Sequence, residues 1–289
     1  MNNILVTGGN GQLGSELKEI ASNYPDYNFL FTDVKDLDIT NHTAVAAFIK
    51  SNNINVIINC AAYTAVDKAE SEPKLSDAIN HLAVANFAQI AKDNNIKLIH
   101  ISTDYVFDGT NHKPYVETDT PNPKSVYGVT KLDGELAMQQ INPANSIIIR
   151  TSWVYSKFGN NFVKTMLRLA ETRDEISVVA DQIGSPTNAA DLAEAILNIL
   201  PQISNETVEL FHYSNEGVCS WYDFAKAIFE IDGLTIKANP IESAQYPTPA
   251  ERPFYSVLNK KKIKEKYKIK VPYWKDALIK CMEIINYED

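Results

Sequence analysis

Residues 4–14 read Ile4-Leu5-Val6-Thr7-Gly8-Gly9-Asn10-Gly11-Gln12-Leu13-Gly14, and an amphipathic stretch follows over 16–21. The apolar run at 4–7 is typical of a buried strand. The glycines fit both Gly-x-Gly-x-x-Gly and Gly-x-x-Gly-x-x-Gly. Such glycines permit a tight turn and let the backbone approach a pyrophosphate, which then lies at a helix N-terminus. The order strand, glycines, helix therefore predicts a dinucleotide-binding site.

A second apolar run over 28–32 ends at Asp33. A dinucleotide-binding fold places the carboxylate that contacts the adenosine ribose at this position. Asp33 favours NADH, whereas the neighbouring Lys35 is compatible with the phosphate of NADPH. We therefore expect a nicotinamide cofactor, NADPH or NADH.

Strand and helix patterns alternate along the first 200 residues. Further strands are predicted over 56–60, 97–101, 146–150 and 176–179, and helices over 43–51, 74–93, 125–140 and 162–171. Continuous apolar strands separated by helices indicate a parallel sheet that is covered on both faces. The sequence thus predicts an α/β fold, a Rossmann-type doubly wound parallel sheet.

The sequence pattern changes after residue 200, where the alternation of apolar strands and helices ends. Prolines gather at 240, 247, 249 and 253, and Ser220 with Asp223 predicts a capped helix running to residue 230. We expect a smaller C-terminal substrate lobe that closes over the carboxyl edge of the sheet. The expected division is a dinucleotide-binding Rossmann domain over 1–152 and about 175–200, and a substrate-binding lobe over about 153–174 and 201–289.

Composition narrows the functional class. The 289 residues carry a net charge of −9, which argues against nucleic acid as a partner. No apolar stretch reaches membrane-spanning length, so no membrane association is expected. Because a strand lies at the N-terminus, we expect no signal peptide, and the three separated cysteines indicate reduced thiols in a cytoplasmic protein. No Cys/His cluster has metal-ligand spacing, so no metal is expected.

Three side chains predict carbonyl reduction. Tyr127 and Lys131 are four residues apart and share a helix face, and Thr103 follows the fourth predicted strand. An ammonium beside a phenol is expected to lower the phenol's pKa from about 10 toward working pH. Thr103 would hold a carbonyl oxygen, Tyr127 would protonate it, and Lys131 would also bind the nicotinamide ribose.

Together these motifs resemble the extended short-chain dehydrogenase/reductase superfamily and, more narrowly, its dTDP-4-dehydrorhamnose reductase family. The resemblance covers the chain from end to end, at 7–14, 59–70, 102–109, 150–155, 181–187, Arg252-Pro253, Ser256 and Leu258. It implies NAD(P)H-dependent reduction of the C4 keto group of dTDP-4-dehydro-L-rhamnose to dTDP-L-rhamnose, a step of nucleotide-sugar and polysaccharide biosynthesis. The protein would be a monomer or a homodimer.

The resemblance also implies roles for individual residues. Catalysis would fall to Thr103, Tyr127 and Lys131. The cofactor would contact Gly8, Gly11, Gln12, Leu13, Gly14, Asp33, Asp38, Ile39, Ala62, Tyr63, Thr64, Ile101, Tyr127 and Lys131. The substrate would contact Thr103, Asp104, Tyr127, Trp153, Asn161 and Arg252, the last through the diphosphate. Trp153 as a core residue and Arg252 in a surface ion pair remain alternatives.

Two local departures limit what the resemblance implies. Related sugar-nucleotide dehydratases carry Thr-Asp-Glu after the fourth strand, whereas this chain has Tyr105 at the third position, so the base for elimination is missing. Some family members are described as using magnesium at a dimer contact. Residues 188–194 show no convincing acidic cluster and the chain stops early, which argues against that arrangement here.

Two other functions remain open at this point. The chain is also compatible with a reductase of another nucleotide-linked 4-keto sugar. A non-catalytic, NADP-binding regulatory subunit of methionine adenosyltransferase resembles the same family. Substrate profiling would separate the first alternative, and a pull-down beside a turnover assay would separate the second.

Overall fold

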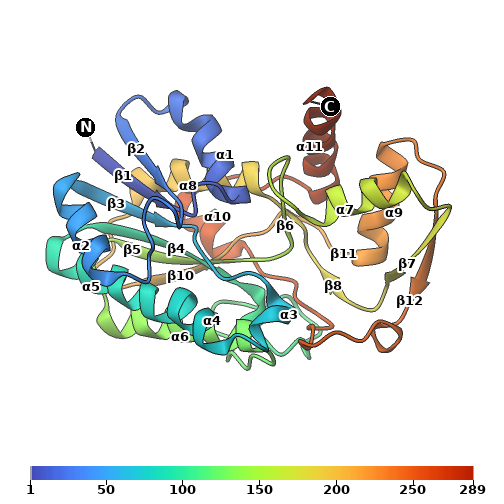
Figure 1. Ribbon diagram of the computed structural model, residues 1–289, viewed down its shortest axis with the longest axis horizontal. Helices are drawn as coiled ribbons and strands as arrows, with labels where there is room; N and C mark the ends of the chain where they lie inside the picture. The colour runs from blue at the N-terminus through green and yellow to red at the C-terminus, as the bar shows by residue number, and fades with distance from the viewer. Residues whose placement is uncertain (1, 289) are drawn as a thin grey trace.

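A parallel sheet forms the centre of the protein (Figure 1). The computed structural model describes residues 2–288, with side chains through residue 285. Within these residues the main sheet has six strands in the order β10-β5-β4-β3-β1-β2, and its paired strands run parallel. Their bounds are β1 Asn2–Thr7, β2 Tyr27–Thr32, β3 Ile54–Asn59, β4 Lys97–Thr103, β5 Ser146–Thr151 and β10 Glu209–His212.

The strand order reverses between β1 and β3. From β1 the chain moves outward to β2, then returns past β1 to β3 and continues to β4 and β5. Doubly wound sheets bind ligands outside the carboxyl ends of the strands at such a reversal. The glycine turn at 8–14 follows β1, so it lies at this point.

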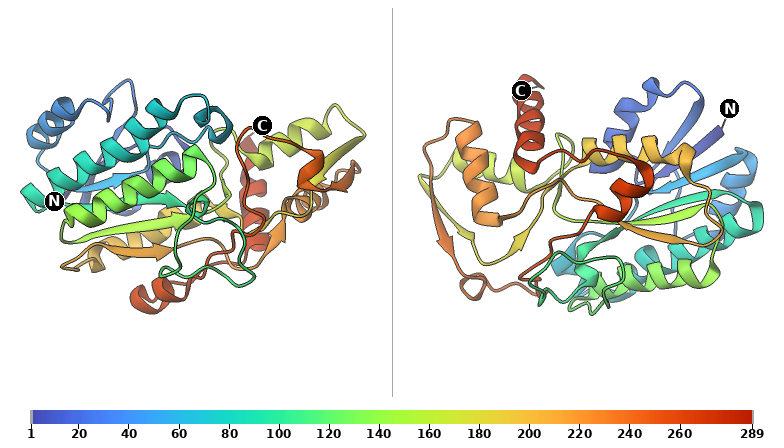
Figure 2. Two further views of the ribbon diagram at one scale, coloured as in Figure 1. Left: turned by 90° about the horizontal axis from the view of Figure 1, so that it is seen from below. Right: turned by 180° about the vertical axis from the view of Figure 1, so that it is seen from behind.

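Helices cover both faces of the sheet (Figures 1 and 2). One face packs on α1, α8 and α10, and the other on α2, α5 and α6. The burial of strand residues on both faces explains the continuous apolar strand patterns. The helices span α1 Gln12–Ile20, α2 His42–Ser51, α3 Val66–Ala69, α4 Pro73–Asp77, α5 Ala83–Asn94, α6 Val126–Ile141, α8 Ala189–Ile199 and α10 Lys261–Tyr267.

A smaller lobe lies beside the sheet and has its own apolar core (Figure 2). That core combines residues from α7, α9, α11 and β7. The lobe elements are β6 Val154–Tyr155, α7 Phe162–Ala170, β7 Glu175–Val179, β8 Ile183–Gly184, β9 Thr187–Asn188, β11 Cys219–Ser220, α9 Trp221–Ile231, β12 Lys237–Ile241 and α11 Trp274–Glu288. β7 pairs with β12 in parallel, β6 with β9 in parallel, and β8 with β11 antiparallel.

The prediction that residues 176–179 form a sixth strand of the main sheet is wrong. The strand exists as β7, but it pairs with β12 in the lobe, and the sixth place in the main sheet belongs to β10. β7 alternates exposed and buried residues, as a strand with one covered face does. β10 has only four residues, Glu-Leu-Phe-His, and gives no comparable apolar run. The division into two domains stays a prediction.

Most predicted helices are present with small shifts of their ends, but the one predicted over 74–93 is divided into α4, a π-helical segment at Ala78–Leu82 and α5. Ser220 caps α9 through a capping box with Asp223, as the sequence predicts. Ser125 caps α6 by accepting a hydrogen bond from the Gly128 backbone N–H. Among the described residues, no helix is both long and apolar enough to cross a membrane.

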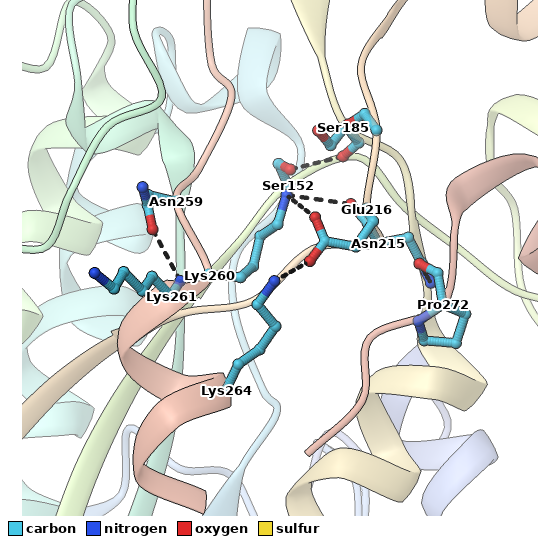
Figure 3. A network of polar contacts seen from close by, with 10 residues as sticks. Ser152, Ser185, Asn215, Glu216, Asn259, Lys260, Lys261, Lys264 and Pro272 are labelled. Carbon is cyan, nitrogen blue, oxygen red and sulfur yellow. Dashed lines mark hydrogen bonds and ion pairs between the residues drawn. The ribbon is translucent and has the colours of Figure 1, made fainter. Parts of the chain in front are cut away.

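A polar network fastens the segment that follows β10 (Figure 3). Glu216 accepts contacts from Lys264 Nζ at 2.5 Å and from the buried Lys260 Nζ at 3.5 Å. The backbone N–H of Glu216 donates to the Pro272 carbonyl at 2.8 Å. The network therefore ties the exit from the main sheet to α10 and to the start of α11.

Candidate active site

A cavity of about 620 Å³ lies at the carboxyl ends of the strands and extends to the lobe. Its wall contains most of the residues that the sequence assigns to binding and catalysis. These are Gly8, Gly11, Gln12, Leu13, Asp33, Asp38, Ile39, Ala62, Thr64, Ile101, Thr103, Asp104, Tyr127, Lys131 and Trp153.

The glycine turn forms one end of the cavity, and side chains at two of its glycines would clash with neighbouring backbone. Gly8 has φ +65°, and a Cβ on it would lie 2.8 Å from the Ala61 backbone nitrogen. A Cβ on Gly14 would lie 2.2 Å from the Gly8 carbonyl oxygen, so this glycine lets α1 approach the turn closely. Gly11 precedes α1 without a capping side chain, which leaves helical N–H groups available to a phosphate. This backbone fits a dinucleotide pyrophosphate.

Asp33, the predicted contact to the adenosine ribose, lines the cavity beside the glycine turn. Its Oδ2 accepts a hydrogen bond from the Asn10 N–H at 3.1 Å, and its Oδ1 accepts one from the Val34 N–H at 2.8 Å. These bonds connect the end of β2 with the glycine turn. Asp38 and Ile39 line the same end of the cavity.

The predicted catalytic side chains converge at the carboxyl end of β4. Thr103 ends the strand, and Tyr127 and Lys131 lie in the first two turns of α6. Lys131 Nζ donates to the Ile101 carbonyl at 2.6 Å, and Thr103 Oγ1 donates to Asp104 Oδ1 at 3.0 Å. Thr103, Tyr127 and Lys131 all line the same cavity, so one ligand bound there could contact the hydroxyl, the phenol and the ammonium together.

The expected lowering of the phenol's pKa is wrong for this structure. Burial raises the pKa of Tyr127 to about 12, and a hydrogen bond with Thr103 only partly opposes the rise. Burial also lowers the pKa of Lys131 to about 8, against the opposing charge of Glu135. The Lys131 ammonium donates to the Ile101 carbonyl, and desolvation dominates at both groups. Tyr127 is therefore a protonated acid at neutral pH.

Asp104 is a buried carboxyl in the wall of the same cavity. Burial raises its pKa to about 6, while hydrogen bonds, including one from Thr103, act in the opposite direction. The carboxylate prevails above that pH and accepts hydrogen bonds. Such a group suits recognition of a sugar hydroxyl beside the reacting carbonyl.

A buried ion pair joins the helix that carries two of the predicted catalytic residues to β5. Arg150 Nη2 donates to Glu135 Oε2 at 2.6 Å, and Ser102 Oγ donates to Glu135 Oε1 at 2.5 Å. Glu135 lies one turn after Lys131 on α6, and Ser102 immediately precedes Thr103 on β4. The pair therefore connects the helix and both strands that carry the site.

Trp153 takes an unusual backbone conformation, with φ +49°. Its ring stacks on Trp221 with centroids 3.6 Å apart and planes 11° apart, and it also lines the cavity. Trp153 therefore packs against the lobe and also lines the cavity, and its contact with the sugar stays a prediction.

Four predicted residues lie outside the cavity wall. Gly14 supports the turn, and the Tyr63 hydroxyl donates to Glu72 at 2.6 Å. Asn161 caps α7 by accepting from the Lys164 N–H at 3.2 Å. Arg252 forms a two-pronged ion pair with Asp67, at 2.9 and 2.7 Å, which resembles the surface-pair alternative. The binding roles of these residues stay predictions.

Several wall residues were not predicted from the sequence. Tyr105 contacts the Tyr127 ring edge-on at 5.5 Å. Most of the others lie at or after the carboxyl ends of strands or in the lobe, and those positions were the available signal. Ile79 and Leu192 lie on helices that pack beside the sheet. The unpredicted wall residues include Val34, Leu37, Cys60, Ala61, Val66, Ile79, Ser102, Tyr105, Thr151, Ser152, Val154, Gly159, Asn160 and Leu192.

One group of ligand-type side chains lies elsewhere on the protein. Atoms of Asp77, His81 and Asp133 lie within 4.8 Å of one another on the outer helices. Exposed acidic groups commonly gather in this way without an ion, and His81 already pairs with Asp77 at 2.9 Å. The arrangement gives no evidence for a metal in the catalytic cavity.

Comparison with known proteins agrees with this geometry over the whole chain. The RmlD substrate binding domain family matches residues 1–286. A dTDP-4-dehydrorhamnose reductase of Sinorhizobium fredii is 45% identical over 282 residues, which cover 95% of this chain and 94% of that protein. Solved structures of such reductases are similar as well. One from Clostridium acetobutylicum has a TM-score of 0.93 and 42% identity, covering 98% of this chain and 99% of the other.

A further solved structure comes from Bacillus anthracis. It is a dTDP-4-dehydrorhamnose reductase in complex with NADP, with a TM-score of 0.93 and 39% identity, covering 98% of this chain and all of the other. The similarity runs through both the sheet and the lobe. By sequence and by structure, this chain belongs to the dTDP-4-dehydrorhamnose reductase family.

Proposed function

We propose that this protein reduces the C4 keto group of dTDP-4-dehydro-L-rhamnose to give dTDP-L-rhamnose, using NADPH or NADH. The observation that carries the proposal is one shared cavity. It joins a glycine turn suited to a pyrophosphate with Thr103, Tyr127 and Lys131. The family membership supports the same activity.

The protein's side chains supply a proton and hold the reacting groups. Tyr127 gives its phenolic proton to the carbonyl oxygen as negative charge develops there, and its raised pKa keeps that proton in place at neutral pH. Thr103 holds the same oxygen by a hydrogen bond. The bound nicotinamide supplies the hydride that completes the alcohol. Lys131 binds the ribose of the cofactor and adds positive charge beside the developing alkoxide.

Recognition of the sugar nucleotide involves the lobe as well as the sheet. Asp104 accepts a hydrogen bond from a sugar hydroxyl, and Trp153 offers an apolar face to the sugar ring. Arg252, held by Asp67, meets the diphosphate as a planar cation. The protein acts in the cytoplasm as a monomer or a homodimer.

The test measures loss of NADPH or NADH absorbance with dTDP-4-dehydro-L-rhamnose and identifies the product. Formation of dTDP-L-rhamnose, with one cofactor oxidised per alcohol formed, establishes the activity and the cofactor preference together. Tyr127→Phe serves as the matched control, since it removes only the proton that the mechanism needs.

Other outcomes would contradict the proposal. Turnover of a different nucleotide-linked 4-keto sugar, with none of this one, would replace the substrate. No turnover by protein that still binds the cofactor, together with capture of methionine adenosyltransferase, would replace the enzyme by a regulatory subunit.

A further inference from the structure

Trp153 occupies a backbone region that bulky side chains rarely adopt. It has φ +49° and is the second residue after β5, where the chain leaves the main sheet for the lobe. Strained backbone of this kind persists only where the surrounding structure determines it, and it is concentrated at functional sites. The contacts that hold Trp153 therefore matter to the site.

Hydrogen bonds fix the backbone on both sides of the ring. Ser152 Oγ donates to the Ser185 carbonyl at 2.8 Å (Figure 3), and the Trp153 carbonyl accepts from the Thr187 N–H at 3.2 Å. Both partners lie in the segment of β8 and β9. The backbone is thus fastened to the lobe, while the ring itself needs separate support.

Two residues support the ring from the lobe. Trp221 stacks on it with centroids 3.6 Å apart, nearly parallel. Gly184 lies so close that a Cβ there would be 2.6 Å from Trp153 Cε2. The pairing of β11 with β8 sets Cys219 opposite Gly184, two residues before Trp221. The register of one short strand pair therefore fixes both supports together.

Trp221 is itself held firmly. It is the first residue of α9, directly after the Ser220 cap, and its ring contacts Phe162 of α7 at 4.7 Å between centroids. Trp153 lines the catalytic cavity, whereas Trp221 lies behind it and is absent from the cavity wall. Of the aromatic rings that Trp221 contacts in the described residues, Trp153 is the one that lines the cavity.

We propose that Trp221 is a positioning residue that sets the Trp153 ring at the sugar end of the catalytic cavity and thereby determines affinity for the keto-sugar. The inference rests on the proposed function, since it deepens the account of the same site. Trp221 supplies a rigid flat support, Gly184 supplies the room, and Trp153 transmits both to the substrate. The cofactor end is built on the glycine turn, which reaches this segment through the hydrogen bond from Gln12 Nε2 to the Val154 carbonyl at 3.4 Å, and Trp221 does not line that end.

The test compares Trp221→Leu, which removes the flat support, with Trp221→Phe, which keeps a smaller one. Stacked indoles give an exciton pair in the far-ultraviolet circular dichroism spectrum, so this signal reports the Trp153–Trp221 contact directly. Trp274→Phe is the matched control, because it removes a buried tryptophan of the same lobe outside the stack.

We expect Trp221→Leu to lose the exciton pair and to raise KM for dTDP-4-dehydro-L-rhamnose on the order of tenfold, because a misplaced contact weakens binding and alignment of the substrate. The Kd of NADPH stays unchanged. Trp221→Phe restores most of the KM, and Trp274→Phe keeps both the exciton pair and the KM. A merely structural role would not separate the two ligands in this way.

Gly184→Ala tests the same ring through a second neighbouring residue. The added Cβ must displace the Trp153 ring while Trp221 remains, so KM rises with the NADPH Kd again unchanged. The inference is overturned if Trp221→Leu loses the exciton pair but keeps KM within about twofold of the parent. Failure of the parent protein to reduce the keto-sugar would instead overturn the proposed function, and the inference with it.

Discussion

The two ends of the catalytic cavity are built in different ways. The cofactor end consists of turns that directly follow β1 and β2, where Gly8, Gly11 and Asp33 contribute mainly backbone shape and one carboxylate. The sugar end depends on residues from distant segments, because Trp153 lies against both Gly184 and Trp221. Local sequence is therefore sufficient for one end, whereas the other exists only after the lobe has folded against the sheet.

Tyr127 and Lys131 lie where the two ends meet, so they give the strongest test of the comparison. Tyr127→Phe should lower turnover on the order of 10²- to 10⁴-fold, because the proton donor is lost. NADPH binding, measured by fluorescence titration, should stay intact, since the glycine turn is untouched. An equal loss of cofactor affinity would mean that the two ends are not separable at this residue.

The second largest effect is expected at the buried ion pair between Glu135 and Arg150, which lies on and beside the elements that carry the predicted catalytic residues. Glu135→Gln leaves Arg150 charged and buried without its partner, which should lower the free energy of unfolding by about 3–5 kcal/mol. Chemical denaturation would measure the change. The exposed Glu171→Gln is the matched control and should be nearly neutral. A small effect at Glu135 would show that the site does not depend on this support.

The pH dependence of kcat/KM should distinguish Lys131, which is expected to bind the cofactor, from Asp104, which is expected to bind the sugar. Lys131, with a pKa of about 8, loses its charge as pH rises through that value, whereas Asp104, with a pKa of about 6, loses its charge as pH falls through that value. A plot of kcat/KM against pH should therefore be bell-shaped, with about a tenfold fall per pH unit beyond each limit. Asp104→Asn should abolish the acidic limb and keep the basic limb. Persistence of the acidic limb in that variant would assign it to another group.

The smallest effect is expected at the helix caps, of which we compare one in the lobe with one beside the main sheet. Ser220→Ala and Asn41→Ala each remove a side chain that accepts a backbone hydrogen bond at a helix start, and each should cost about 1 kcal/mol of stability. Only Ser220→Ala should also raise KM for the keto-sugar, because Trp221 directly follows it. Thermal unfolding and steady-state kinetics on the two variants would provide the test. If the two variants have the same KM for the keto-sugar, the cap of α9 does not affect the sugar end of the cavity.

Much of the fold was predictable because its determinants are local. The glycines at 8–14, Asp33 after the second strand, and the Tyr127–Lys131 spacing each lie within one strand–turn–helix unit. The caps at Ser125 and Ser220 are local as well. These patterns report the backbone conformation of their own residues, so no distant contact is needed to interpret them.

The rest depends on contacts that no short pattern contains. β7 reads as an apolar strand, but its partner is β12, which includes Pro240 and gives little strand signal of its own. The pairing of Arg252 with Asp67 and the stacking of Trp153 on Trp221 join segments far apart in the chain. The raised pKa of Tyr127 is a further example, since burial by surrounding elements outweighs the effect that its spacing from Lys131 predicts.

The late arrival of β10 in the main sheet has a practical consequence for dividing the protein. The chain enters the lobe after β5, returns for α8 and β10, enters the lobe again for β11, α9 and β12, returns for α10, and enters the lobe a third time for α11. A fragment cut after α8 would retain the glycine turn and Tyr127, but it would leave the edge of β5 without its neighbour. Unpaired strand edges promote aggregation. The cofactor half is therefore poorly suited to use as a detachable part for building other enzymes, unless the strand at Glu209–His212 is carried along with it.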